Sequence, residues 1–82
     1  MTQNKQQFNY SALLGLMREN GFTQESLAAA AGMSHSQLNL KLNGRYPFKQ
    51  ADIKRIADTL GILPVDIGRY FFTPRAEKTH QI

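Results

Sequence analysis

Uncharged hydrogen-bonding side chains recur between Ser34 and Asn43, at spacings that bring several of them to one side of a helix. At about 100° per residue, Ser36 and Asn43 lie within about 20° of each other, whereas Leu38 and Leu42 face the opposite way. Amide and hydroxyl groups donate and accept hydrogen bonds, and this suits them to the edges of DNA bases in the major groove. We therefore predict a base-reading set in which leucine meets a thymine methyl group: His35, Ser36, Gln37, Asn39 and Leu40. The alternative is an ordinary solvated helix face, with His35 making a local hydrogen bond near the helix start.

A run of positive charge surrounds these residues. All six acidic residues lie outside the window from Ser26 to Ala51, while three cations lie inside it. Such a window predicts contacts with a phosphate backbone, made by a set that flanks the base-reading residues: Gln24, Lys41, Asn43, Arg45 and Lys49. The alternative is a basic face that serves solubility, since a formal net charge of +4 is common in soluble domains.

Other chemistry finds little support in the sequence. Ser34 and His35 are adjacent, but neighbours on a helix point about 100° apart, so they do not form a nucleophile and its base. The chain has no cysteine, and its two histidines are far apart. We expect neither an enzyme nor a bound metal or cofactor, and no small-molecule effector. Met1 to Gln7 lacks the pattern of an export signal and no long apolar run follows, so we expect a cytoplasmic protein.

The elements that would position these residues are helices, and the fold class predicted is all-α with five helices. Apolar spacing and capping residues predict helices over Phe8–Asn20, over Gln24–Ala31 and from Ser34 onward. A fourth helix carries Ile53, Ile56, Ala57 and Leu60 on one face and ends at Gly61, and a fifth begins near Pro64 and stops at Thr73. We expect one compact domain over residues 8–72, with flexible segments over 1–7 and 73–82.

The third segment also carries a signal for β-structure. Leu38, Leu40 and Leu42 alternate with polar residues and lead into Asn43-Gly44, which is typical of a strand followed by a hairpin turn. Ser34 and Gln37, however, fit a capping box, which is chemistry that starts a helix. Because a lone hairpin would also lack a sheet to join, we predict a helix.

The segment TQESLAAAAGMSHSQL (23–38) resembles the helix-turn-helix of phage repressor and Cro-type proteins, found also in the xenobiotic-response-element family of regulators. With FNY (8–10), LNLKLNG (38–44) and YFFTP (70–74), the chain resembles small Cro-like phage proteins of Gram-positive bacteria. The resemblance implies a compact lambda-repressor-like domain in a bacterial host. The family usually places a branched apolar residue where Lys41 stands, so we expect Leu42 to take over part of the inward packing and the recognition helix to be rotated or shortened.

These observations predict a phage-type transcriptional regulator that occupies a double-stranded DNA operator. Since one small module buries little surface on DNA, we also predict a homodimer, at least on DNA, with a cluster of terminal aromatics as its interface: Tyr70, Phe71 and Phe72. The alternative for these aromatics is a role in the domain core. The alternative function is a modulator of the antirepressor type, which uses the same fold to bind another regulator in place of DNA.

Overall fold

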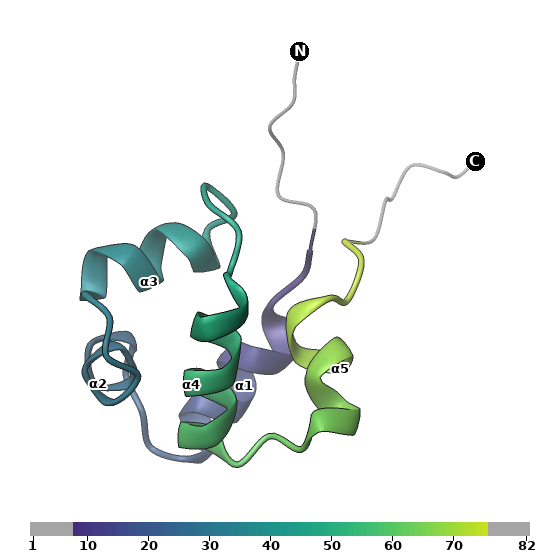
Figure 1. Cartoon of the computed structure of the whole chain (residues 1–82), viewed down its shortest axis with the longest axis horizontal. Helices are drawn as coiled ribbons and strands as arrows, with labels where there is room; N and C mark the ends of the chain where they lie inside the picture. The colour runs from purple at the N-terminus through teal and green to yellow at the C-terminus, as the bar shows by residue number, and fades with distance from the viewer. Residues whose placement is uncertain (1–7, 76–82) are drawn as a thin grey trace.

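The computed structural model describes residues 8–75, and these form five α-helices and one turn of 3-10 helix (Figure 1). The helices are α1 (Ser11–Glu19), α2 (Gln24–Ala30), α3 (His35–Leu42), α4 (Gln50–Leu60) and α5 (Ile67–Phe71), with the 3-10 turn η1 at Pro64–Asp66. The predicted all-α class is therefore confirmed. None of the helices within residues 8–75 is long and apolar enough to cross a membrane.

Short-range hydrogen bonds explain where α2 and α3 begin. At each start a hydroxyl accepts from a backbone N–H three residues on, at 3.0 Å from Thr23 to Ser26 and at 3.0 Å from Ser34 to Gln37. The Ser26 and Gln37 side chains accept in return from the backbone N–H groups of Thr23 and Ser34, which completes a capping box at both places. The segment after Ser34 is thus a helix, and its alternating leucines do not make it a strand.

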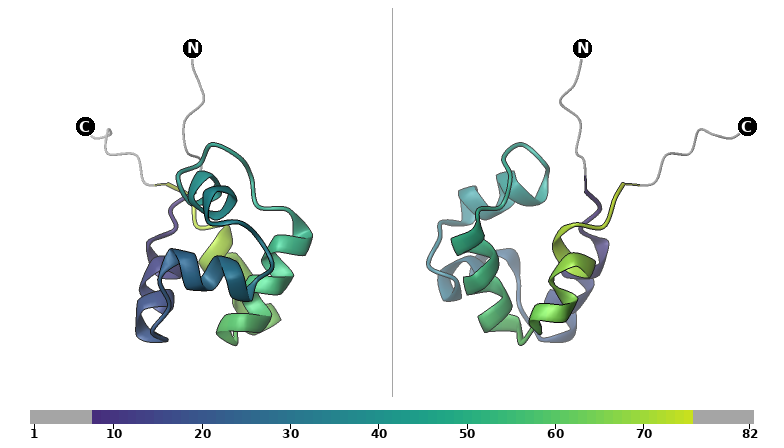
Figure 2. Two further views of the ribbon diagram at one scale, coloured as in Figure 1. Left: turned by 90° about the vertical axis from the view of Figure 1, so that its left-hand side faces the viewer. Right: turned by 45° about the vertical axis from the view of Figure 1, so that its right-hand side comes forward.

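Between α2 and α3 the chain turns at Gly32, where φ is +73°. A side chain on this residue would strain the backbone, because L-residues rarely adopt such a φ. The turn brings α3 across α2, and these two helices make the most extensive helix-to-helix contact in the described chain (Figure 2). Ala28 and Ala31 are almost fully buried, so small side chains lie where the segments come close.

One apolar core joins all five helices. Leu13, Leu27, Leu38 and Ile56 are fully buried, one from each of α1 to α4, and Phe71 adds α5 with 1% of its surface exposed. Three aromatic rings line the side of this core near α5. The Phe48 ring packs edge-on against both Tyr10 and Phe71, with ring centroids 5.3 Å apart in each pair.

The two ends of the described chain lie together, which differs from the predicted domain boundaries. The Asn9 N–H donates to the Thr73 carbonyl at 2.8 Å, and Phe8 and Pro74 form an isolated β-bridge. Thr73 and Pro74 therefore belong to the folded unit, not to a tail. The predicted first helix is also shorter than expected and begins at Ser11, whose N–H donates to the Asn9 side chain at 2.8 Å. The predicted flexible segments at 1–7 and 76–82 lie outside the described residues.

Candidate interaction surface on α3

Two leucines pack on the core side of α3, as predicted. Leu38 is fully buried and Leu42 is 6% exposed, so Leu42 packs inward as the sequence indicated. The opposite side faces solvent. His35, Ser36 and Gln37 are exposed there, Asn43 is exposed just beyond the last turn, and Asn39 and Leu40 are half-buried. The residues predicted to read bases are thus brought together on α3, and we call them, with Asn43, the α3 surface.

Much of the hydrogen-bonding capacity of the α3 surface is used within the protein. The Gln37 side-chain oxygen accepts from the Ser34 N–H at 3.2 Å and so belongs to the helix cap. The Asn39 amide donates to the Gln24 side-chain oxygen of α2 at 3.1 Å, and Asn39 accepts from the Asn43 amide at 3.1 Å. Gln24, Asn39 and Asn43 therefore form a chain of amides that ties α3 to α2. An external partner would have to share or break these bonds.

Lys41 is not exposed at the surface, as a phosphate contact would require. Its ammonium group is buried and pairs with the Asp52 carboxylate of α4, with 11% and 8% of the two side chains exposed. An ammonium so placed is already neutralised and does not reach a surface partner. The expectation that Lys41 contacts phosphate is therefore corrected. Exposure was expected because lysine is rarely buried unless its charge is paired, and the partner, Asp52, lies in the next helix.

Asp52 is the centre of a small polar cluster at the start of α4. In addition to Lys41, its carboxylate accepts from the Lys49 backbone N–H at 2.9 Å and lies 3.8 Å from the Arg55 guanidinium. Burial raises the pKa of the Asp52 carboxyl, but the hydrogen bonds from Lys41 and the Lys49 N–H and the nearby charges of Lys41 and Arg55 outweigh it. The net result is a pKa below the ordinary value, so the charged carboxylate is stabilised in the folded state.

This lowered pKa predicts an acid-sensitive contribution to stability. Because the folded-state pKa lies below the unfolded one, the contribution is fully present above the ordinary carboxyl pKa of about 3.9 and is lost as the pH falls through the folded-state value. Urea denaturation between pH 7 and pH 2 is expected to show this loss, and Asp52→Asn is expected to remove it. Asp58, whose exposed carboxylate pairs with Lys54 at 3.3 Å, supplies the control variant Asp58→Asn. An acid profile that Asp52→Asn leaves unchanged would contradict the assignment.

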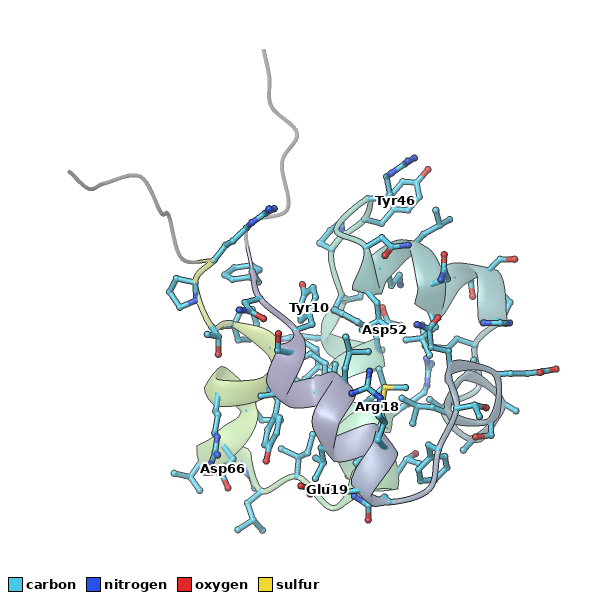
Figure 3. All side chains as sticks on the ribbon, turned by 180° about the vertical axis from the view of Figure 1, so that it is seen from behind. Tyr10, Arg18, Glu19, Tyr46, Asp52 and Asp66 are labelled. Carbon is cyan, nitrogen blue, oxygen red and sulfur yellow. The ribbon has the colours of Figure 1, made fainter. Side chains whose placement is uncertain are left out.

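The loop after α3 presents an aromatic side chain that the sequence reasoning did not select. The Arg45 N–H donates to the Leu40 carbonyl at 2.9 Å and holds the loop against the end of α3. The ring of Phe48 turns inward to Tyr10, whereas Tyr46 is 58% exposed and lies at the outer end of the loop (Figure 3). The signal available in the sequence was an aromatic residue between Gly44 and Pro47, in a loop too short to bury two rings. Arg45 and Lys49 are also exposed beside it.

The terminal aromatics predicted as a dimer interface divide between core and surface. Phe71 is buried and Tyr70 is half-buried against the core, so neither presents a full ring to a partner, and for Phe71 the core alternative is correct. Phe72 is 49% exposed and packs edge-on against Phe8 with ring centroids 5.5 Å apart. It also borders a groove of about 530 Å³ between α4 and α5, lined by Ile53, Ile62 and Ile67 together with the charged residues Lys54 and Asp58.

The geometry described so far defines a small all-helical protein with a largely uncharged surface on its third helix. Comparison with known families and structures refines this class. Residues 6–74 match the sequence model of a family described as "Protein of unknown function (DUF739)", and the chain belongs to this family. Among curated proteins, no significant sequence match was found.

A solved structure is similar to this chain over nearly its full length. It is the solution structure of the modulator of repression (MOR) of the temperate bacteriophage TP901-1 from Lactococcus lactis. The two are 35% identical with a TM-score of 0.72, and the match covers 87% of this chain and 96% of the other. The chain is therefore similar in sequence and in fold to a small helical phage regulator.

Proposed function

We propose that this protein is a phage regulatory protein that modulates repression by binding another regulator through its α3 surface and the adjoining Tyr46. The likeness to a phage modulator of repression supports the regulatory role. The observation that carries the choice of a protein partner is the burial of Lys41 against Asp52, because it removes the one Lys or Arg in residues 35–42 from the presented surface.

The chemistry of the presented surface fits a protein partner better than a phosphate backbone. Affinity for DNA depends largely on cations that displace counterions from phosphates. The α3 surface offers amides already bonded to one another and a half-buried Leu40, with the exposed ring of Tyr46 beside it. Tyrosine is enriched at the energetic centres of protein interfaces, where charged residues are depleted. We infer that the partner is the phage repressor itself, bound through a surface of similarly low charge.

Substitution of Tyr46 tests this proposal. Tyr46→Ala is expected to weaken binding to the cognate repressor about 10- to 30-fold, as is typical when an interface tyrosine is truncated. Isothermal titration calorimetry with the cognate phage repressor would measure the change. Since Tyr46 is exposed, the variant is expected to keep the helical content of the parent protein.

Val65 provides the matched control for this experiment. It is 83% exposed and lies in η1, beyond the C-terminal end of α4, whereas Tyr46 precedes the N-terminal end of that helix. Val65→Ala is expected to bind the repressor as tightly as the parent protein. Equal losses in the two variants, or no loss in either, would contradict a partner surface built on α3 and Tyr46.

Direct DNA binding is the second candidate function. It is favoured by the window from Ser26 to Ala51, which has no acidic residue and exposes Arg45 and Lys49 next to α3. In this case Ser36 and the free amide group of Gln37 read bases, and occupancy of the operator represses transcription. The predicted homodimer belongs to this candidate, with Phe72 at the contact because Phe71 is buried.

The salt dependence of DNA binding tests this candidate function. With Arg45 and Lys49 as its phosphate contacts, each protomer is expected to give a slope of log K against log salt of about −1.8, where a third cation would give about −2.7. Gel-shift titrations at several salt concentrations would measure it, with Lys49→Ala reducing the slope by about 0.9. Gln37→Ala is expected to weaken operator binding and leave random DNA unaffected. Equal loss on both would remove Gln37 from base reading.

A further inference from the structure

α3 is anchored in the core along a narrow row. Its two buried leucines, Leu38 and Leu42, are one turn apart and about 40° apart around the helix axis. A row this narrow fixes the distance of the helix from the core. It restrains rotation about the helix axis only weakly, because apolar contacts have no preferred direction.

Directional contacts hold α3 on both flanks of this row. Lys41 lies about 60° to one side of Leu38 and pairs with Asp52 of α4, while Asn39 lies about 100° to the other side and bonds to Gln24 of α2. The two flanking contacts therefore oppose rotation of α3 about its own axis in opposite directions. The Lys41–Asp52 ion pair is charged and buried, whereas the hydrogen bond between the Asn39 and Gln24 side chains is half-buried.

The partner of Lys41 is itself fixed in place. Asp52 sits in the first turn of α4, where it accepts from the Lys49 N–H and faces the Arg55 guanidinium across 3.8 Å. Its carboxylate is thus held by the start of its own helix as well as by Lys41. A buried ion pair adds little net stability compared with well-packed apolar groups, and its best-attested use is to select one packing arrangement among several.

We propose that the Lys41–Asp52 pair is a positioning element that sets the rotation of α3, and so determines which side chains the α3 surface presents. The part of this inference that concerns recognition of a partner rests on the proposed function. The rotation of α3 itself does not depend on what the surface binds.

The test is a double variant, Lys41→Met with Asp52→Asn. Methionine keeps the length of the lysine stem, and the asparagine side-chain oxygen still accepts from the Lys49 N–H, so the core stays filled and the cap of α4 remains. The melting temperature is expected to stay within about 5 °C of the parent protein. Residual dipolar couplings of backbone amides are expected to change in α3 and to be preserved in α1, α4 and α5. If the correct rotation is then populated one time in ten, the affinity for the repressor falls about tenfold.

The exposed pair Lys54 and Asp58 gives the matched control, since it has the same residue types with 78% and 70% of the side chains exposed. Lys54→Met with Asp58→Asn is expected to change neither the couplings of α3 nor the affinity. Unchanged α3 couplings in the buried-pair variant would overturn the proposal. A melting temperature lowered by more than about 15 °C would also overturn it, because the pair would then hold the whole domain together. If the parent protein binds no repressor, the couplings still decide the positioning role, while the proposed function fails by itself.

Discussion

Asp52→Ala is expected to lower the free energy of unfolding by about 3 kcal/mol or more, because removal of one partner leaves a buried charge without compensation. The Lys41 ammonium would stay in a site with 11% exposure, and the Lys49 N–H at the start of α4 would lose its acceptor. Small domains are stable by about 5–15 kcal/mol, so this is a large part of the total. Urea denaturation followed by circular dichroism would measure the loss.

Asp58→Ala is the control for this substitution. The Asp58 carboxylate is 70% exposed and pairs with Lys54 on the surface of the same helix, an arrangement that contributes little. We expect a change of at most about 0.5 kcal/mol. If Asp52→Ala were as mild as Asp58→Ala, the description of a buried ion pair between α3 and α4 would be wrong.

Phe71→Ala is the second substitution with a large expected effect, at about 3–5 kcal/mol of lost stability. Phe71 has 1% of its surface exposed and packs edge-on against Phe48, which in turn packs against Tyr10. Its removal opens a cavity where α5 meets the core, and the two remaining rings lose part of their support. Thermal or urea denaturation would detect a protein that is largely unfolded or close to it.

The neighbouring aromatic tests whether this effect is specific. Phe72 is 49% exposed and keeps one edge-on contact with Phe8, so Phe72→Ala is expected to cost about 1 kcal/mol or less. A larger loss from Phe72→Ala than from Phe71→Ala would mean that the two rings have been assigned to the wrong sides of α5.

Local chemistry made most of the fold predictable from the sequence. Thr23, Ser34 and Gln37 act on backbone groups three residues away, and Gly32 acts on its own φ, so their effects can be read without knowledge of distant contacts. Helical periodicity also placed Leu38 and Leu42 inward and His35, Ser36 and Gln37 outward. These predictions depend on helical periodicity alone.

What the sequence could not supply were pairings between separate helices. Lys41 pairs with Asp52 across a loop, and Asn39 bonds to Gln24 on the preceding helix. The side chains were therefore wrongly expected to be exposed, with their donors and acceptors free. Three consecutive aromatics could not be divided between core and surface before the direction of α5 was known. These pairings change the character of the α3 surface, which is less charged and less free to bond than periodicity indicated.

We propose that α3 and the loop after it form the surface that contacts another regulator. Titration of the isotope-labelled protein with its cognate repressor, followed by amide chemical shifts, tests this most directly. Shift changes are expected to centre on Ser36, Leu40 and Tyr46, and operator DNA alone is expected to produce none of comparable size at the same concentration. Changes confined to the groove between α4 and α5, or strong changes at α3 with DNA alone, would contradict it.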